Sequence, residues 1–324
     1  MSQIQPDTEL SGTELPDTEV PKQEIQVEIE TEKNPVDENW DKEQLNIEIP
    51  KGLDGSNITI TNDYVTQTVV IRFNKFSEDY SKLYRIYGSS NHISSIAYYK
   101  DGESGVLNIY LDRVYEYSYR YKNGYLCMEF IDPHELYDKV VVIDAGHGGG
   151  APGAVEKGVL EKNLNLAVLK ELKALLDKEK NIKVYYTRTG DVNPSLQQRV
   201  NLANQAKADL FISIHHNSSS SGTFDSKRGT LVLYNHKDKS EFSSLRLANI
   251  CLDNVVASTG GYRMGLLQGN YVHIVDNCQV PMALIEVGYM TNLAELEELQ
   301  KPEYQKKAAQ GIYNAILQAF AEGY

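Results

Sequence analysis

Apolar and polar residues follow two different rhythms in the second half of the chain. Nearly continuous apolar runs at residues 140–143, 210–214 and 282–285 are typical of strands covered on both faces of a parallel sheet. At 160–176 and at about 303–321, apolar residues recur every three or four positions, which predicts amphipathic helices. We therefore expect an α/β fold here, a mostly parallel twisted sheet flanked by helices.

Polar residues mark where two further helices should begin. Asn193 and Pro194 have the types favoured at an N-cap and at the first helical position, before an apolar stripe at about 196–203. Asn292 followed three residues later by Glu295 resembles a capping box. We expect a helix after each pair.

The preceding part of the chain has the pattern of strands alone. Short runs rich in β-branched and aromatic residues, at 57–61, 67–73, 106–110 and 125–130, are separated by Asn, Asp, Gly and Ser. They predict a small antiparallel β domain over residues 46–137. This block also holds 13 of the 22 tyrosines. Tyrosine favours strands, so ordinary packing explains them; the alternative is an exposed aromatic face that binds a partner.

Charge separates a third segment. Residues 1–45 contain 13 acidic residues and 3 lysines, which is a net charge of -10 out of -13 for the whole chain, and no aromatic residue precedes Trp40. Such a segment buries too little apolar surface to offset its ordering entropy. We expect a disordered acidic linker or stalk. The acidic chain has no basic stripe, which argues against nucleic-acid binding.

The first candidate for chemistry is His147, which follows the strand at 140–143 inside a glycine-rich turn. Ligands of open α/β sheets bind at the carboxyl ends of the strands. Residues 146–151 also fit the dinucleotide pattern G-x-G-x-x-G/A. That pattern requires a helix to open inside the glycines, whereas here Pro152 and Gly153 intervene and helical periodicity starts only near Val159.

Three further residues join His147. Glu161 lies in the first turn of the predicted helix, His215 ends the second apolar strand and Glu286 ends the third. Strand alternation sends His215 and the adjacent His216 to opposite faces, so only one of them can join a given site. Two histidines and two carboxylates suit zinc hydrolysis, in which three protein ligands leave a position for water and a further carboxylate acts as base.

These motifs together resemble a known family. VVIDAGHGG, the Glu-Lys-Asn-Leu helix start, ADLFISIHHN and PMALIEVGYMTN occur in the order and at the spacings of zinc-dependent N-acetylmuramoyl-L-alanine amidases of the amidase-3 family. The resemblance covers roughly residues 139–324. It implies one zinc ion held by His147, Glu161 and His215, with Glu286 as the catalytic carboxylate.

Two positions depart from the family pattern. Ala151 stands where family members usually have an acidic residue before Pro-Gly, so any role of that acid in ordering the loop or binding substrate is in doubt. His216 occupies a place that is commonly small. We expect His216 to be a partly exposed bystander; the alternative is a contact to the metal ligands or to substrate.

The resemblance implies a peptidoglycan hydrolase, an autolysin-type enzyme that cleaves the amide between N-acetylmuramic acid and L-alanine, with zinc-activated water as nucleophile and Glu286 as general acid and base. Two alternatives remain: a zinc peptidase that cuts within the stem peptide, and a non-catalytic wall-binding protein. On this interpretation residues 138–324 are the catalytic domain and 46–137 a wall-targeting module.

The expected substrate also sets the expected location. No signal peptide and no run of 18 apolar residues occurs in the sequence. An acidic stalk at the start is what remains when a secreted or membrane-tethered protein is cut after its leader. We therefore expect an extracytoplasmic protein, either secreted or held at the cell envelope by a membrane tether ahead of this chain, that works as a monomer.

Two smaller features complete the sequence picture. Cys127, Cys251 and Cys278 are odd in number and widely spaced, and we expect burial rather than pairing. The polar loop at 217–228 follows His215 directly. It is either a flexible connection or a segment that closes over substrate.

Overall fold

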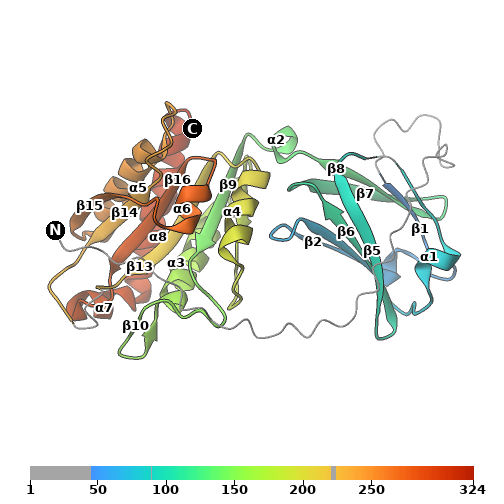
Figure 1. The fold of residues 1–324 in the computed structure, drawn as a ribbon, viewed down its shortest axis with the longest axis horizontal. Helices are drawn as coiled ribbons and strands as arrows, with labels where there is room; N and C mark the ends of the chain where they lie inside the picture. The colour runs from blue at the N-terminus through green and yellow to red at the C-terminus, as the bar shows by residue number, and fades with distance from the viewer. Residues whose placement is uncertain (1–44, 89, 220–223) are drawn as a thin grey trace. The chain divides into compact units, whose positions relative to one another are not determined.

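The computed structural model describes residues 45–88, 90–219 and 224–324, which form two compact units that meet in sequence near residue 137. We call residues 45–136 the β unit and residues 137–324 the α/β unit (Figure 1). The predicted acidic linker lies outside the described residues except for its last position, Leu45. That residue is fully buried and begins the first strand, so the prediction of disorder was wrong there.

The β unit contains eight strands in two antiparallel sheets, ordered β4-β1-β8-β7 and β2-β3-β6-β5. Its strands are β1 (Leu45–Glu48), β2 (Ile58–Asp63), β3 (Thr68–Phe73), β4 (Ile86–Tyr87), β5 (Ile93–Asp101), β6 (Ser104–Leu111), β7 (Glu116–Lys122) and β8 (Tyr125–Ile131). Short helical turns are η1 (Gly55–Asn57), α1 (Tyr80–Leu83) and α2 (Pro133–Leu136). The predicted antiparallel fold is confirmed, and four of its strands, β2, β3, β6 and β8, fall on the predicted runs.

One apolar core joins the two sheets of the β unit. Ile47 and Leu126 from one sheet pack in the same buried cluster as Ile71 and Ile109 from the other. Alternating side chains on strands β1 and β3 supply this inner layer, as the period of a strand requires. The β unit is therefore a sandwich with an apolar core between its two sheets.

The α/β unit is built on a six-stranded sheet of order β12-β9-β13-β16-β14-β15. These strands are β9 (Lys139–Ala145), β12 (Ile182–Tyr186), β13 (Leu210–Asn217), β14 (Thr230–Tyr234), β15 (Arg263–Gln268) and β16 (Met282–Tyr289). Every neighbouring pair is parallel except β14 with β16. The predicted mostly parallel sheet is confirmed. The carboxyl ends of β9, β13 and β16 consequently lie at one edge, which is where His147, His215 and Glu286 were expected.

Helices cover both faces of this sheet (Figure 1). They are α3 (Glu161–Leu176), α4 (Leu196–Gln205), α5 (Ser244–Thr259), α6 (His273–Asn277), α7 (Leu293–Leu299) and α8 (Pro302–Ala321), and a small hairpin, β10 (Val155–Glu156) with β11 (Val159–Leu160), precedes α3. Apolar residues of α3, α5 and α8 share one core with Val141 and Ile212. Helix α4 contacts α6 and the strand β9. The sheet is thus buried on both sides, as its near-continuous apolar strands predicted.

The two predicted helix starts differ from the structure in detail. Helix α4 is capped by Ser195 in a complete capping box with Gln198, two residues later than the predicted cap at Asn193. A serine hydroxyl there accepts from the N–H three residues on, which makes it the better cap. Asn292 does cap α7, by accepting from the N–H of Glu295 at 3.1 Å. The Glu295 carboxylate is engaged elsewhere, accepting from the N–H groups of Gly229 and Tyr289.

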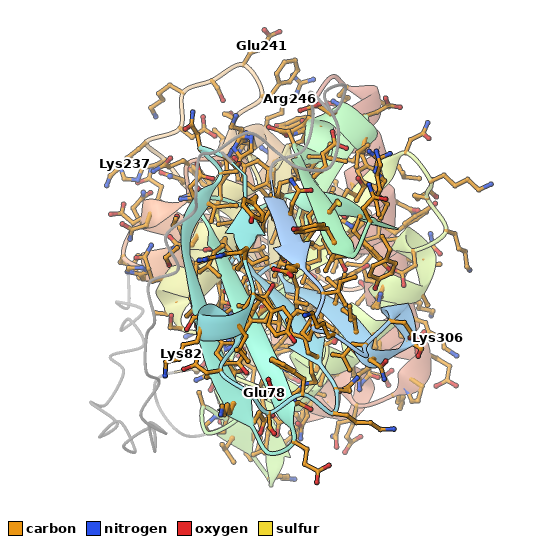
Figure 2. The ribbon with its side chains drawn as sticks, turned by 90° about the vertical axis from the view of Figure 1, so that its right-hand side faces the viewer. Glu78, Lys82, Lys237, Glu241, Arg246 and Lys306 are labelled. Atoms are coloured by element: carbon orange, nitrogen blue, oxygen red, sulfur yellow. The ribbon has the colours of Figure 1, made fainter. Side chains whose placement is uncertain are left out.

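Most charged side chains project outward, as Glu241 and Lys306 do in Figure 2. All three cysteines are free and buried, as expected. Among the described residues, no helix is both long and apolar enough to cross a membrane. Four charged side chains of the described residues are buried instead, and they lie close to the carboxyl edge of the sheet: Asp144, Glu161, Arg188 and Arg199.

Candidate metal centre

His147 follows β9 in a backbone conformation that non-glycine residues rarely adopt, with φ of 59°. Two buried arginines fix the carbonyl groups around it. Arg188 donates to the carbonyl oxygens of Ala145 at 2.8 Å and Gly146 at 2.9 Å. Arg199 donates to those of Ala145 and of His147 itself, both at 2.8 Å. A strained backbone conformation persists only where the surrounding structure holds it, and these four hydrogen bonds hold the backbone of this turn.

Arg199 is held in turn by Asp144, the last but one residue of β9. The two side chains are 2% and 0% exposed and lie 2.5 Å apart. Asp144 also accepts from the hydroxyls of Thr187 at 2.5 Å and Ser213 at 2.6 Å. Burial alone raises the pKa of Asp144, but the charge of Arg199 and the two hydroxyl hydrogen bonds lower it to about 2. The turn that presents His147 therefore rests on a buried ion pair.

A second pair of charges orders the outer part of the same turn. Lys162 donates to the carbonyl oxygen of Gly149 at 2.7 Å and lies 2.8 Å from Asp191, which accepts from the N–H of Gly149 at 2.8 Å. The backbones of Gly148 and Ala151 bond to each other in both directions, at 2.8 and 2.9 Å. Asp191 thus orders this loop although residue 151 carries no acid.

Glu161 is the first residue of α3, and its carboxylate lies between the two histidines. Its Oε2 is 3.1 Å from His147 Nε2, and its Oε1 is 3.0 Å from His215 Nδ1. The side chain is only 6% exposed. Burial alone raises the pKa of Glu161, but hydrogen bonds from both histidines, with their charge, hold it well below its ordinary value.

Two glycines make this approach sterically feasible. A Cβ atom at Gly146 would lie 2.1 Å from His215 Nε2, and one at Gly153 would lie 2.5 Å from Glu161 Oε2. Both distances are too short for atoms that are not bonded to each other. The glycines of the turn are therefore required by the convergence of the three side chains as well as by the turn itself.

His147, Glu161 and His215 offer nitrogen and oxygen atoms that all lie within 4.8 Å of one another, a grouping that could hold a metal ion. Among the described residues this is the one such group, and His216 is outside it. Alternation along β13, as predicted, separates the two histidines. Ring centroids of His147 and His215 are 5.0 Å apart.

The expectation that His216 is partly exposed was wrong. It is 2% exposed, and its Nδ1 lies 2.7 Å from Oδ1 of Asn165 on α3. Burial lowers the pKa of His216 to about 4, so the ring is neutral at physiological pH. Helix α3 covers the face of β13 that carries residue 216, which the strand pattern alone could not reveal.

Glu286 lies on β16, directly paired with His215 of β13 in a parallel register. Paired residues of neighbouring strands point to the same face of the sheet. Glu286 is half-buried. The fourth candidate residue is therefore next to the metal-ligand group but is not part of it.

The described ends of the loop after β13 are attached to the segment after β16. Ser219 N–H donates to the Thr291 hydroxyl at 3.1 Å, and Asp225 N–H donates to the Thr291 carbonyl at 3.0 Å. Residues 220–223 lie outside the described residues. The predicted closure of this loop over substrate involves those residues and stays a prediction.

Sequence reasoning assigned no role to Asp144, Asn165, Arg188 or Arg199. Asp144 is one residue short of the end of its strand, and the arginines lie more than 40 residues along the chain from the turn that they hold. One signal was available: a charged residue within an apolar strand such as 140–145 requires a buried partner.

Comparison with known proteins agrees with the motifs. A family model described as N-acetylmuramoyl-L-alanine amidase matches residues 141–318. The Bacillus subtilis protein YqiI is 36% identical over 193 residues, covering 59% of this chain and 88% of YqiI. The germination-specific N-acetylmuramoyl-L-alanine amidase of the same organism is 31% identical over 201 residues, covering 58% of this chain and 82% of that protein.

Solved structures give the same answer. The catalytic domain of CwlV, an N-acetylmuramoyl-L-alanine amidase from Bacillus (Paenibacillus) polymyxa var. colistinus, is 35% identical with a TM-score of 0.52, covering 56% of this chain and 98% of that one. The N-acetylmuramoyl-L-alanine amidase from Clostridium difficile 630 is 31% identical with a TM-score of 0.54, covering 57% and 98%. With the family match over 141–318, these findings show that this chain belongs to the N-acetylmuramoyl-L-alanine amidase family.

Proposed function

We propose that His147, Glu161 and His215 hold one zinc ion in this amidase and that Glu286 is its catalytic acid and base. Two imidazoles and one carboxylate within 4.8 Å of one another are a donor set that catalytic zinc commonly takes, and this convergence is the observation that carries the proposal. Bound zinc supplies Lewis-acid chemistry, polarising a carbonyl and making water acidic enough to be a nucleophile near neutral pH.

The chain's own residues then divide the work. The buried Glu161 stays ionised because two imidazoles face it, so the site keeps a negatively charged ligand between the two histidines. Glu286, which pairs with His215 across the strands, would take a proton from the attacking water. It then returns that proton to the leaving amine, the usual task of a general acid and base.

Membership of the family identifies the scissile bond as the amide between the lactyl group of N-acetylmuramic acid and L-alanine in peptidoglycan. A zinc peptidase acting within the stem peptide would need the same metal residues. Digestion of purified peptidoglycan followed by mass analysis distinguishes the two. The amidase releases stem peptides that begin with L-alanine, whereas glycan that still carries L-alanine would contradict the proposal.

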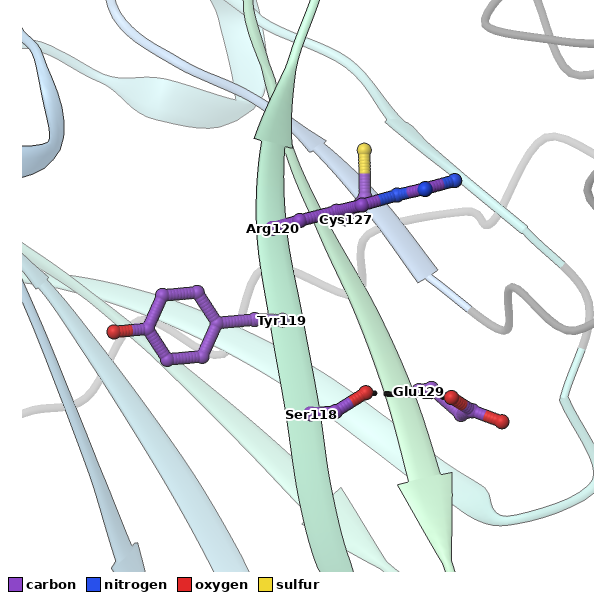
Figure 3. A pocket seen from close by; sticks show the side chains of 5 residues that line it. All are labelled: Ser118, Tyr119, Arg120, Cys127 and Glu129. Carbon is purple, nitrogen blue, oxygen red and sulfur yellow. Dashed lines mark hydrogen bonds between the residues drawn. The ribbon is translucent and has the colours of Figure 1, made fainter.

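We also propose that the β unit directs the enzyme to the cell wall. Its edge strand β7 exposes Tyr119 and Tyr121 to 49% and 42%, with ring centroids 5.8 Å apart. Figure 3 shows Tyr119 on the opposite side of β7 from Ser118 and Arg120, so the aromatic face is separate from the polar one. The two rings meet edge to face, at an interplanar angle of 73°, and their exposed parts offer apolar surface to sugar rings.

The substrate places the protein's work outside the cytoplasm, at the envelope. We propose that the residues before strand β1, 1–44, act as a spacer there, with a membrane tether preceding them. The enzyme works as a monomer on this proposal, since all four site residues come from one chain.

A further inference from the structure

Asn165 lies fully buried on α3, one helical turn after the metal-ligand candidate Glu161. Its Nδ2 donates to Glu161 Oε1 at 3.2 Å and to the carbonyl oxygen of Gly146 at 3.1 Å. Its Oδ1 lies 2.7 Å from His216 Nδ1. A single amide thus contacts a candidate ligand, the turn before His147 and the histidine that follows His215.

These contacts fix the hydrogens without ambiguity. Both N–H groups of the amide face acceptors, a carboxylate and a carbonyl, so turning the amide over would place its oxygen against two other oxygens. The oxygen must accept from His216, whose Nδ1 therefore carries the hydrogen. His216 Nε2 is buried and makes no hydrogen bond among the described residues. The His216 ring therefore makes one hydrogen bond among the described residues, the bond from Nδ1 to Asn165.

We propose that Asn165 is a positioning residue that holds the Glu161 carboxylate in place to bind metal, and that His216 acts through Asn165 by fixing its amide. The arrangement fits the geometry of α3, since residues four apart lie on one face of a helix. Hydrogen bonds to a metal-binding carboxylate set its orientation and tune its affinity. This inference rests on the proposed zinc site, and it gives the buried His216 ring a role.

The test measures the zinc dissociation constant of the full chain by competition with a chelator, and the thermal unfolding of the zinc-free protein. Asn165→Ala should weaken zinc binding by about 10- to 100-fold, the usual effect of removing a residue that orients a ligand. Asn163→Ala is the matched control, because Asn163 is exposed on the same helix and should leave zinc binding unchanged. If Asn165→Ala does not fold, Asn165→Asp replaces it. Aspartate has the same shape, but an oxygen replaces the N–H group that donates to Glu161, so zinc binding should again be weakened.

His216→Ala should weaken zinc binding by about fivefold, the worth of one neutral hydrogen bond. His216→Asn should restore most of that loss, because its amide N–H can replace the donor at Nδ1. In the Asn165→Ala background, His216→Ala should have no further effect, since it acts through the missing amide.

The outcomes separate cleanly. Wild-type affinity in Asn165→Ala, or a change confined to the unfolding temperature of the zinc-free protein, would overturn the positioning role. Losses that multiply in the double variant would overturn the claim that His216 acts through Asn165. If the wild-type chain itself binds no zinc, the proposed function fails and the positioning role fails with it. If the wild-type chain binds zinc and Asn165→Ala binds it equally well, only the positioning role fails.

Discussion

The two units bury different kinds of side chain. Among the described residues, the buried polar positions of the β unit are uncharged: Asn46, Thr68 and Asn108. The α/β unit buries two carboxylates and two guanidinium groups: Asp144, Glu161, Arg188 and Arg199. Burying a charge costs free energy unless the group is paired and hydrogen-bonded, so each of these groups requires partners in the fold.

All four of these charges serve the same place. Asp144 holds Arg199, and Arg199 and Arg188 hold the carbonyl groups of the turn that presents His147. Glu161 lies at the centre of the candidate metal site. Among the described residues, the buried charges and the candidate metal group therefore lie in the α/β unit, while the β unit is a sandwich stabilised by apolar burial. Changes in the two units should therefore affect different measurements.

The largest effect should follow removal of a histidine of the metal group. His147→Ala and His215→Ala each leave only two ligands, so most zinc should be lost from purified protein and activity should fall with it. Metal analysis of the purified variants checks this. His273→Ala, an exposed histidine of the same unit, is the control and should retain the wild-type zinc content. Full zinc content in both test variants would remove the assignment.

Glu286→Gln should separate metal binding from catalysis. The amide preserves the shape of the side chain but cannot take up a proton, so turnover should fall by roughly 10² to 10⁴ while zinc content stays near that of the wild type. Assays on muropeptides together with metal analysis test both parts. Near-normal turnover would mean that another residue handles the proton, and zinc loss would make Glu286 a ligand.

Most of the strands and site residues of the α/β unit could be predicted from the sequence. The apolar strands at 140–143, 210–214 and 282–285 are buried on both faces of a parallel sheet, so continuous hydrophobicity identified them. The four site candidates follow from strand ends and from the resemblance, and three of them converge in the structure. In the β unit, strand β7 was missed because its residues are mostly exposed and carry little pattern.

What the sequence could not supply was the tertiary partners. His216 looked exposed because nothing in the pattern of β13 shows that α3 covers its face. Asn165 is a polar residue on the apolar face of α3, and the sequence does not show that it is buried in contact with Glu161 and His216. The cap of α4 was misplaced by two residues because Asn193 and Ser195 are both good caps, and only the geometry of the loop chooses between them.

Breaking the buried ion pair should destabilise the α/β unit by about 3–5 kcal/mol, because Arg199→Met leaves Asp144 charged without its partner. Chemical denaturation of the variant tests this. The exposed pair of Arg263 and Asp253 provides the control, and Arg263→Met should change the free energy of unfolding little. A small effect of Arg199→Met would mean that Thr187 and Ser213 alone hold Asp144.

The same carboxylate should make the unit sensitive to acid. The pKa of Asp144 is lowered to about 2 in the folded state from 3.8, so its ionised form stabilises the fold above about pH 4. That contribution, about 2 kcal/mol, should be lost as the pH falls from about 4 to about 2, where the folded protein must take up the proton. Unfolding measured across this range should show a shallower pH dependence in Asp144→Asn than in the wild type.

The smallest effect on catalysis should come from removing the β unit altogether. A fragment starting near Asp138 contains the whole six-stranded sheet, its helices and all four site residues, so it should fold, bind zinc and cleave small soluble muropeptides at close to the full-length rate. On intact sacculi it should be roughly severalfold slower, because it lacks the effective concentration that a second binding site provides. Deleting only residues 1–44, which precede strand β1, should alter neither rate much, since a spacer contributes reach rather than contacts. Equal rates on sacculi would exclude targeting by the β unit, and a faster fragment would show that the β unit restrains the enzyme.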